Sequence, residues 1–452
     1  MEPSTMQTPE DAFSYVTPIG YTNSSSCGYC GGGRRGKSVF KKRYSYYATS
    51  TSMTPEFYQG LLDHYWRRSG SLLYRPNQRQ SCCPHYTIRL DATLYKPSRD
   101  HRQTVNRFNT HVLGKDYAEK ASHVQRRSKA DKKKRQTEFD LIERIHEAEL
   151  DKMSVPPEPA HKFSVTLEHD DFTEEKFLVY ENYQRVVHKE KPSEITRNGF
   201  RRFLCDSPLR RSVEKTADGK DKHLGSYHHC YRLDGKLVAI GVLDLLPQCV
   251  SAVYFLYHDS IHQFSPGKLG AVREIALALE GGYRYWYPGF YIHSCPKMRY
   301  KIDYSPQYVL DPESLSWDLL SPEILGLLDK SAYVSYSAYQ KRKALKDGED
   351  AAQGDLPASD VVMGDDAVDD EPPLLFNTDM PGIPPLSDMA KLDLSNIALR
   401  VPGQQELVTT GDLVIWREQA LSPEGGLKTK IAELVAAIGP ELKESLCLDF
   451  SR

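Results

Sequence analysis

The stretch YHHCYRLDGKLVAIGVLDLLPQCVSAVYFLYHDSIHQFSPGKLGAVREIALALEGGYRYWY spans residues 227–287. Its first half is rich in β-branched and aromatic residues and predicts three strands, over 227–233, 236–246 and 250–257. Asp234-Gly235 separates the first two strands by only two residues, which is the signature of a tight β-hairpin. We therefore expect the first two strands to pair antiparallel.

A helix and a further strand follow these three strands. Ser265-Pro266 supplies an N-cap and a first-turn proline, the helical segment runs to Glu280, and Gly281-Gly282 ends it. Another strand begins at Tyr283. Antiparallel strands followed by a helix and a strand occur in this order in the acyl-CoA N-acetyltransferase (GNAT) superfamily. The predicted fold class is α+β, with a GNAT-like mixed sheet as the core.

Two segments of different composition flank this core. Residues 347–390 contain 12 acidic and no basic side chains and are rich in Pro, Gly and Ala. Such a segment cannot bury enough apolar surface to offset the entropy of ordering, so we predict an acidic disordered linker. Residues 114–160 are highly charged, and a helical pattern within them begins at Phe139 and ends at Pro156.

The net charge of the chain hides an uneven distribution. The 452 residues include 59 Lys and Arg and 61 Asp and Glu, yet residues 1–150 carry 25 basic against 15 acidic side chains. A basic region can bind a phosphate backbone through counterion release. The alternative is an ordinary solvated charged surface, and the two interpretations are about equally supported by charge alone.

Several protein classes are not expected from the composition. The sequence contains no apolar run of the roughly 18 residues that span a membrane. Its N-terminus, Met1 to Gly20, lacks the basic start and apolar centre of a signal peptide. Nine Cys are too few for a disulfide scaffold in a chain of this length. We expect an intracellular protein in a reducing compartment.

Four of the nine cysteines form two close pairs. Cys27 and Cys30 are separated by two residues in a glycine-rich stretch, and Cys82 and Cys83 are adjacent. Both adjacent thiolates can bind one ion only if the chain turns, which the following Pro84 favours. Four Cys grouped in this way predict a structural zinc or an iron–sulfur cluster. A reducible disulfide and scattered structural cysteines are the alternatives, and His85 is a further candidate ligand.

A phosphate-loop pattern overlaps the first cysteine pair. Residues 31–38, GGGRRGKS, match G-x-x-x-x-G-K-[ST]. That loop requires a buried strand before it and a helix after it, whereas serines precede this stretch and a strand-like VFKKRY follows it. We interpret the match as a glycine-rich turn with a basic patch and expect no nucleotide cofactor.

These boundaries divide the chain into five parts. We predict an N-terminal Cys-containing domain, a charged linker helix, a GNAT-like catalytic domain, an acidic disordered linker and a C-terminal extension, over residues 13–113, 114–160, 161–340, 345–393 and 394–452 respectively. Apolar residues in the extension recur at helical spacing from Leu427 to Leu442, which predicts an amphipathic helix that packs on the core. The extension is otherwise expected to be partly disordered.

A series of longer motifs resembles one family. The motifs are C27-x-x-C30, W66RRSG70, C82CPHYTIR89, F203LC205, G225SYH228, D234GKL237, V253YF255, R273EI275 and G289FYIHSCPKMRY300. In series they are similar to the eukaryotic arginyl-tRNA–protein transferases, of the filamentous-fungal type. The resemblance covers residues 13–113 and 163–312.

The resemblance implies a function, a cofactor and partners. It implies transfer of arginine from arginyl-tRNA to the α-amine of proteins that begin with Asp, Glu or oxidised Cys, which marks them for ubiquitin-dependent degradation. It also implies a two-lobed arrangement and zinc or an iron–sulfur cluster on the N-terminal cysteines. We expect a cytoplasmic and also nuclear localisation. No membrane and no DNA partner is expected. The basic cluster Lys132-Lys133-Lys134-Arg135 fits a nuclear localisation signal, a tRNA-facing arm or an exposed helix face.

Two other functions remain compatible with the sequence. One is a non-catalytic regulator that binds tRNA or metal on the same fold, and the other is an acyl-CoA-dependent acyltransferase. The segment QFSPGKLG at residues 263–270 lacks the closely spaced glycines that would hold the pyrophosphate of CoA. An aminoacyl ester is already activated, so the transferase needs no nucleotide hydrolysis.

The chemical requirements of this reaction suggest charged candidates. The acceptor carboxylate or the terminal tRNA phosphates need cations, for which we assign Lys297 and Arg299, and Arg273 is the next candidate. The arginyl guanidinium or the incoming amine needs a carboxylate, for which Asp244 and Glu274 are candidates. The alternatives are a helix-surface pair between Arg273 and Glu274 and a strand-end role for Asp244.

Proton transfer and charge stabilisation require further groups. His228 and His293 are candidate proton carriers, although a lone His such as His293 is more often a core group. Tyr291 and Tyr300 are candidate oxyanion donors or stacking platforms. The remaining candidates for substrate or tRNA binding lie in the N-terminal motifs: Arg67, Arg68 and Arg89.

Overall fold

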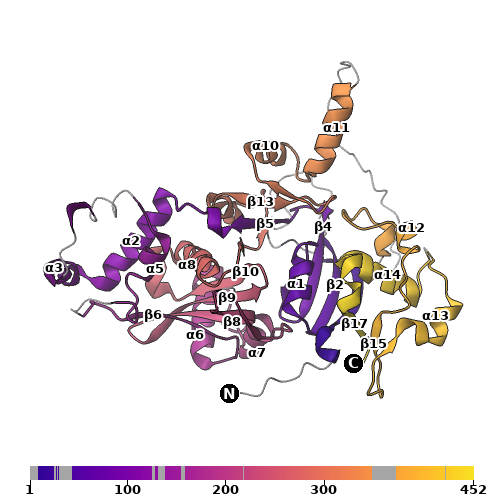
Figure 1. The fold of residues 1–452 in the computed structure, drawn as a ribbon, viewed down its shortest axis with the longest axis horizontal. Helices are drawn as coiled ribbons and strands as arrows, with labels where there is room; N and C mark the ends of the chain where they lie inside the picture. Colours follow the sequence, from indigo (N-terminus) through magenta and orange to yellow (C-terminus); the bar gives the residue numbers. More distant parts are fainter. Residues whose placement is uncertain are drawn as a thin grey trace.

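The 227–287 stretch lies in the larger of two mixed sheets (Figure 1). The computed structural model describes residues 9–24, 27, 29, 43–124, 128–130, 138–153, 158–216, 218–348, 373–422 and 424–451. The ten-stranded sheet has the order β14 (Trp317–Leu319), β13 (Gln307–Leu310), β5 (Tyr86–Asp91), β11 (Tyr285–Tyr287), β10 (Cys249–Tyr257), β9 (Lys236–Leu246), β8 (Asp221–Leu233) and β6 (Phe163–His169), with β12 (Phe290–Tyr291) on β5 and β7 (Ser212–Lys215) on β8. The predicted α+β class is confirmed.

The predicted hairpin joins β8 to β9. The two strands pair antiparallel, and Asp234 and Gly235 occupy the turn with φ of 52° and 78°. A positive φ at both central residues is what the two-residue turn requires, and Asp and Gly tolerate it better than other residues. The strand ending at Tyr257 is β10, which pairs antiparallel with β9.

Helix α8 (Pro266–Glu280) has the predicted bounds, but its start differs from a standard N-cap. Ser265 occupies the cap position in a left-handed conformation, and its side chain makes no capping hydrogen bond. Its hydroxyl instead accepts a hydrogen bond of 3.1 Å from Arg107 Nη2. The helix start is therefore fixed by Pro266 and by contact with the neighbouring helix.

Helices cover both faces of the ten-stranded sheet. The other helices are α1 (Pro55–Leu62), α2 (Arg99–Leu113), α3 (Lys115–Val124), α5 (Leu141–His146), α6 (Glu174–Tyr183), α7 (Arg197–Phe200), α9 (Pro296–Arg299), α10 (Pro322–Lys330), α11 (Tyr336–Gly348), α12 (Leu386–Met389), α13 (Val414–Glu418) and α14 (Leu427–Ile438). Adjacent residues Cys230 and Tyr231 of β8 point to opposite faces. Cys230 packs with side chains of α6 and α7, while Tyr231 packs with side chains of α8, α2 and α5.

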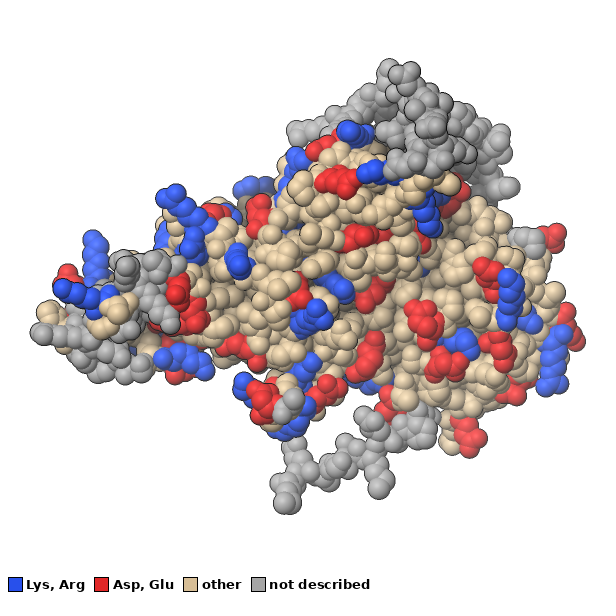
Figure 2. Space-filling model, turned by 45° about the horizontal axis from the view of Figure 1, so that its top comes forward, with Lys and Arg blue, Asp and Glu red and all other residues tan. Residues whose placement is uncertain are grey.

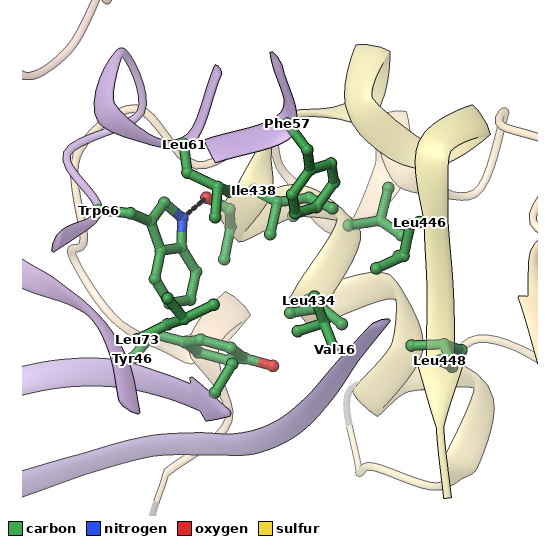
Figure 3. Close-up of a cluster of buried hydrophobic side chains, with 14 of the residues drawn as sticks. Val16, Tyr46, Phe57, Leu61, Trp66, Leu73, Leu434, Ile438, Leu446 and Leu448 are labelled. Atoms are coloured by element: carbon green, nitrogen blue, oxygen red, sulfur yellow. Dashed lines mark hydrogen bonds between the residues drawn. The ribbon is translucent and has the colours of Figure 1, made fainter. Parts of the chain in front are cut away.

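The smaller sheet joins the two ends of the chain. Its order is β16 (Val408–Thr409), β15 (Ala398–Arg400), β17 (Leu446–Asp449), β1 (Ser14–Ser24), β2 (Arg43–Ser52), β4 (Leu72–Ser81) and β3 (Arg67–Ser69). Strand β17 lies parallel to β1, and helix α14 packs over the sheet with Leu434 and Ile438 beside Val16 and Trp66 (Figure 3). A helix thus forms where the apolar spacing of the C-terminal extension predicts one, but it ends at Ile438 rather than Leu442, and residues 431–438 are all buried.

Parts of the two charged segments are described. Of the predicted acidic linker, residues 349–372 lie outside the described residues. Residues 373–393 contribute buried Leu375, Met380 and Met389 to the core of the smaller sheet, because these apolar side chains interrupt the acidic composition. The basic cluster at 132–135 and the phosphate-loop match at 31–38 also lie outside the described residues.

The surface carries charges of both signs. Lys and Arg side chains are interspersed with Asp and Glu over the face shown in Figure 2, rather than gathered in one continuous area. Among the described residues, no helix has the length and apolar composition needed to cross a membrane.

Candidate active site and metal centre

An N-terminal strand lies inside the sheet of the central region. Strand β5 pairs antiparallel with both β11 and β13, and the two residues of β12 pair with its N-terminal half, Phe290 opposite Thr87 and Tyr291 opposite Tyr86. The motif at 289–300 is therefore held directly against the motif at 82–89. A site built here combines residues from both parts of the chain.

The chain leaves β11 and enters the site through a glycine. Strands β10 and β11 run parallel and pair over only three residues each, 249–251 with 285–287. Gly289 then adopts φ +80°, where a Cβ would lie 3.4 Å from Lys301 Nζ and 3.7 Å from the carbonyl oxygen of Ala252. The two strands separate at this point because the backbone turns into β12, and the ammonium group of Lys301 lies beside the turn.

Two buried titratable groups lie next to this turn. Glu274 of α8 accepts a 2.8 Å hydrogen bond from Trp286 Nε1, and burial raises the pKa of its carboxyl group to about 7. Lys301 Nζ donates to the carbonyl oxygen of Phe290 at 2.9 Å. Burial, and next the positive charge of Arg67, lower the pKa of Lys301 to about 7. The carboxyl group and the amine each influence the pKa of the other.

A second polar chain involves the predicted residues Tyr291 and His293. The Tyr291 hydroxyl lies 2.6 Å from His293 Nδ1, and His293 Nε2 lies 2.8 Å from Asp329 of α10. Asp329 can only accept, so in the neutral ring Nε2 carries the proton and Nδ1 accepts from the tyrosine. Arg299 lies 3.5 Å from the same carboxylate. This arrangement can pass a proton between a buried phenol and an exposed carboxylate.

Lys297 and Tyr300 lie on the surface beside this chain. Lys297 is an exposed side chain of α9, and Tyr300 is 44% exposed directly after that helix. The structure therefore brings Glu274, Tyr291, His293, Lys297, Arg299 and Tyr300 around one segment. Lys297, Arg299 and Tyr300 are exposed, whereas Glu274 and Tyr291 are buried.

Arg68 and Asp244 form a buried ion pair away from this segment. Arg68 Nε and Nη2 donate to the two carboxylate oxygens at 2.9 and 2.6 Å, and Nη2 also donates to Ser226 Oγ at 3.0 Å. Although burial opposes it, the Asp244 charge raises the pKa of Arg68 above its usual value. Since Arg68 belongs to β3 and Asp244 to β9, the pair connects the two sheets.

The neighbouring Arg67 has a different environment. It is 7% exposed, its guanidinium group lies 4.7 Å from the Phe290 ring centre, and Nη1 donates to the carbonyl oxygen of Trp66 at 2.7 Å. Its Nε and Nη2 atoms have no hydrogen-bond partner among the described residues. Arg89 lies between the rings of Tyr285 and Trp317, with its guanidinium carbon 4.0 and 3.9 Å from their centres.

The structure places two predicted residues outside the segment that follows Gly289. His228 of β8 is fully buried, its Nε2 lies 3.0 Å from the carbonyl oxygen of Leu204, and burial lowers its pKa to about 4. Arg273 forms a buried ion pair with Glu149, and its Nη2 donates to a backbone carbonyl at 2.6 Å. The predicted roles of His228 in proton transfer and of Arg273 in substrate binding stay predictions. In the structure His228 contacts the Leu204 carbonyl and Arg273 pairs with Glu149.

A pocket of about 360 Å³ lies beside the Arg273–Glu149 pair. His146 bridges Glu149 and Glu280 at 2.7 and 2.9 Å. Hydrogen bonds to Glu149 and Glu280 raise the pKa of His146 to about 9. Glu149 and Glu280 are thus paired with Arg273 and His146, and the other two acidic residues of the pocket, Asp151 and Asp221, pair with Lys152 and Lys215.

Three of the four predicted metal ligands lie together. The Sγ atoms of Cys27, Cys82 and Cys83 are all within 4.8 Å of one another, and the chain bends at the adjacent pair as predicted. A tetrahedral zinc site with Zn–S bonds of about 2.3 Å places its sulfurs about 3.8 Å apart, so these thiols fit a metal with small adjustments. The fourth predicted ligand, Cys30, lies outside the described residues. No disulfide joins two of the described cysteines.

The cysteine group contacts the segment that carries the candidate catalytic residues. Cys27 and Cys83 pack with Ile292 and Cys295, which lie between Tyr291 and the helix that bears Lys297. A metal on these thiols would therefore stabilise the position of the 289–300 segment against the N-terminal part of the chain.

Sequence reasoning missed Lys301 and Asp329. Lys301 directly follows the last residue of the quoted motif, and nothing in the local pattern distinguishes it from exposed Lys297. Asp329 belongs to an ordinary charged helix end at α10, and only the fold brings it to His293.

Two family models match this chain. The model described as "Arginine-tRNA-protein transferase, N terminus" matches residues 25–103, and the one described as "Arginine-tRNA-protein transferase, C terminus" matches residues 175–311. The two matches contain β5 and the strands on either side of it.

Several curated proteins are similar along much of the chain. Arginyl-tRNA–protein transferase 1 of Dictyostelium discoideum is 25% identical and covers 70% of this chain and 86% of its own length. The protein of the same name from Saccharomyces cerevisiae is 31% identical over 54% of this chain and 47% of its own. An aspartate/glutamate leucyltransferase of Helicobacter hepaticus is 24% identical over 57% of this chain and 81% of its own.

Proposed function

This chain belongs to the arginine-tRNA–protein transferase family, and we propose that it transfers arginine from arginyl-tRNA to the amino terminus of acceptor proteins. The observation that carries the proposal is the composite site, in which β5 of the first matched segment holds the 289–300 motif of the second. The chain is accordingly an aminoacyltransferase.

The reaction needs positioning and proton transfer rather than activation. The acceptor α-amine attacks the ester carbonyl, a C–N bond forms, the C–O bond to the tRNA ribose breaks, and one amine proton passes to the ribose oxygen. The α-amine has an ordinary pKa of about 8, so a modest base is sufficient. Glu274 and the Tyr291–His293–Asp329 chain are the candidate proton carriers, since Glu274 bonds to Trp286 just before Gly289 and the other chain begins at Tyr291 just after it.

The acceptors that we propose begin with Asp, Glu or oxidised Cys, and arginylation would mark them for ubiquitin-dependent degradation. The bacterial relative is named for aspartate and glutamate, which supports an acidic acceptor. Exposed Lys297 and Arg299 suit the terminal phosphates of tRNA. We assign the GNAT-like fold to the ten-stranded sheet, with the arginyl ester beside the separation of β10 and β11.

We propose zinc or an iron–sulfur cluster on Cys27, Cys82 and Cys83, with Cys30 as the fourth ligand. Zinc would act as a closed structural centre, whereas a cluster would add sensitivity to oxidation. In either case the chain's own thiols hold the segment around Ile292 and Cys295 in place. We also propose a cytoplasmic and nuclear setting, where thiols are kept reduced.

The test is transfer of labelled arginine to short peptides. The purified chain is incubated with arginyl-tRNA and a peptide that begins with Asp, in parallel with the same peptide N-acetylated. We expect label on the free peptide, none on the acetylated peptide, and none when free arginine replaces arginyl-tRNA. Binding of tRNA without transfer would instead indicate a non-catalytic regulator, and acylation from acyl-CoA would indicate the other alternative.

A further inference from the structure

Two buried cations lie on the two sides of Phe290. The guanidinium group of Arg67 lies over its ring at 4.7 Å, and the ammonium group of Lys301 donates to its carbonyl oxygen at 2.9 Å. The side chains are 7% and 8% exposed as whole residues, so both charges are largely removed from water. The charge of Arg67 reaches Lys301 strongly enough to contribute to the lowering of its pKa.

These two cations have more donors than the described residues satisfy. Nε and Nη2 of Arg67 have no hydrogen-bond partner among the described residues. The ammonium group of Lys301 has three N–H donors, and the described residues offer it one acceptor, the carbonyl oxygen of Phe290. Neither cation has a carboxylate within 4.0 Å among the described residues. Burial of a charge without a partner is unfavourable, so a site of this kind is stabilised when an anion enters.

The nearest carboxylates are engaged elsewhere. The charge of Asp63 interacts with the charges of both Arg89 and Arg67. Its carboxylate accepts a 2.9 Å hydrogen bond from the Tyr287 hydroxyl. Glu274 accepts from Trp286, and burial raises its pKa, so it is partly neutral near pH 7. Both carboxylates thus have other hydrogen-bond donors, and among the described residues neither forms an ion pair with Arg67 or Lys301.

We propose that Lys301 and Arg67 form a binding site for one carboxylate group, and that this group is the side-chain carboxylate of the acceptor's N-terminal residue. The inference rests on the proposed function, which supplies the acceptor. The site is bordered by Phe290 and by the left-handed Gly289, where a Cβ would lie 3.4 Å from Lys301 Nζ, and a carboxylate is the smallest anion that an acceptor side chain offers. A phosphate within tRNA brings two ribose groups with it, and the exposed Lys297 and Arg299 suit it better.

The position of the site agrees with the geometry of the reaction. The turn at Gly289 lies beside Lys301, and Glu274 is close enough for its charge to influence the pKa of Lys301, so an acceptor held there by its side chain would place its α-amine near a candidate proton carrier. An acceptor with Asn in place of Asp would occupy the same volume without the charge. The site would therefore discriminate by charge rather than by shape.

The test measures the preference for Asp over Asn in matched peptides. The variants are Lys301→Gln, which keeps a donor for the Phe290 carbonyl but removes the charge, and Arg67→Gln. The control is Lys176→Gln, because Lys176 is also buried but donates to the carbonyl oxygens of His169 and Asp171 at 2.8 and 3.3 Å. Equilibrium binding of labelled peptides and kcat/KM for transfer are measured for each protein.

We expect each test variant to lose about 10- to 100-fold of the Asp-over-Asn preference, in binding as well as in kcat/KM, because a charged hydrogen bond is lost. The KM for arginyl-tRNA and the Lys176→Gln preference should not change, and Lys301→Arg should keep most of the preference. If Lys301→Gln does not fold, Arg67→Gln and Lys301→Arg decide the matter together.

Two outcomes would overturn the proposal. One is an unchanged Asp-over-Asn preference in the test variants, and the other is a raised KM for arginyl-tRNA with the peptide preference intact, which would assign the site to a phosphate. Absence of transfer to any peptide by the unmodified protein would refute the proposed function instead. Peptide binding that prefers Asp and depends on Lys301 would still support the carboxylate site in that case.

Discussion

Arg67 and Arg68 are neighbours on one short strand, yet their environments are opposite. Arg68 donates to both oxygens of Asp244 and to Ser226, so its charge and its hydrogen bonds are satisfied within the protein. Arg67 lies against an aromatic ring with two nitrogen atoms that have no partner among the described residues. The first arginine connects two sheets, and the second lies at the candidate site.

The same contrast holds for other buried charges. Arg273 of α8 is matched by Glu149, whereas the acceptor that the described residues offer the Lys301 side chain is a backbone carbonyl. Matched buried charges maintain the architecture, because removal of one partner leaves the other unpaired. Unmatched buried charges destabilise the free protein and are expected where a ligand supplies the missing charge. Burial alone therefore does not separate structural from functional residues, whereas the local charge balance does.

The largest expected effect comes from breaking the matched pair. Asp244→Asn keeps the shape of the side chain but leaves the charge of Arg68 buried without a counter-ion. We expect a loss of about 3–5 kcal/mol in the free energy of unfolding, measured by urea denaturation. Lys301→Met removes an unmatched charge and should cost less than about 1 kcal/mol in the same measurement, or stabilise the protein.

The double variant Arg68→Met with Asp244→Leu serves as the control for the matched pair. It replaces the pair by apolar groups and should recover much of the loss, because neither charge then remains buried. Equal destabilisation by Asp244→Asn and Lys301→Met would remove the distinction between matched and unmatched charges.

The next effect is on the pH dependence of stability. Burial raises the pKa of Glu274 to about 7 from an ordinary 4.5, so the folded state binds more protons than the unfolded state between these values. Its contribution to stability is complete below pH 4.5 and is lost as the pH rises toward 7. At about 1.4 kcal/mol per pKa unit the loss is on the order of 3 kcal/mol.

Glu274→Gln should reduce this fall in the free energy of unfolding between pH 4.5 and 7, while its amide oxygen still accepts a hydrogen bond from Trp286. Lys301 has the opposite effect, because its lowered pKa makes the free energy of unfolding rise between about pH 7 and 10.5. This rise should persist in Glu274→Gln. Unfolding free energies from pH 4.5 to 9 measure both the fall and the rise. A variant curve that parallels the unmodified one below pH 7 would show that Glu274 does not titrate in this range.

Local signals account for the parts of the fold that the sequence predicted. The hairpin at Asp234-Gly235 and helix α8 follow from turn, proline and glycine signals within a few residues. The pairing of Ser14–Val16 with Leu446–Leu448 could not be predicted, because a parallel strand pair carries no local signal of its partner. The same holds for β5, whose partners β11 and β13 are known only from the fold.

The candidate site divides in the same way. Cys27, Cys82 and Cys83 could be predicted because cysteine pairs are rare and their chemistry is specific. Lys301 could not, because a lysine signals nothing until its burial and partners are known. Arg68 and Asp244 were predicted as separate site residues, and the structure joins them as one pair. The sequence thus identified the important segments better than the role of each charge within them.

The smallest expected effect concerns an uncharged side chain, Trp66, whose hydrogen-bonding group has a partner within the protein. Trp66 Nε1 donates to the carbonyl oxygen of Ala437 at 2.7 Å and so joins the segment before β3 to helix α14 (Figure 3). Trp66→Phe removes this hydrogen bond and part of a buried ring, and we expect a loss of about 1–3 kcal/mol in the free energy of unfolding without an altered Asp-over-Asn preference. A changed preference would mean that packing at the smaller sheet also positions Arg67. The charge balance at the site would then depend on the docking of the C-terminal helix.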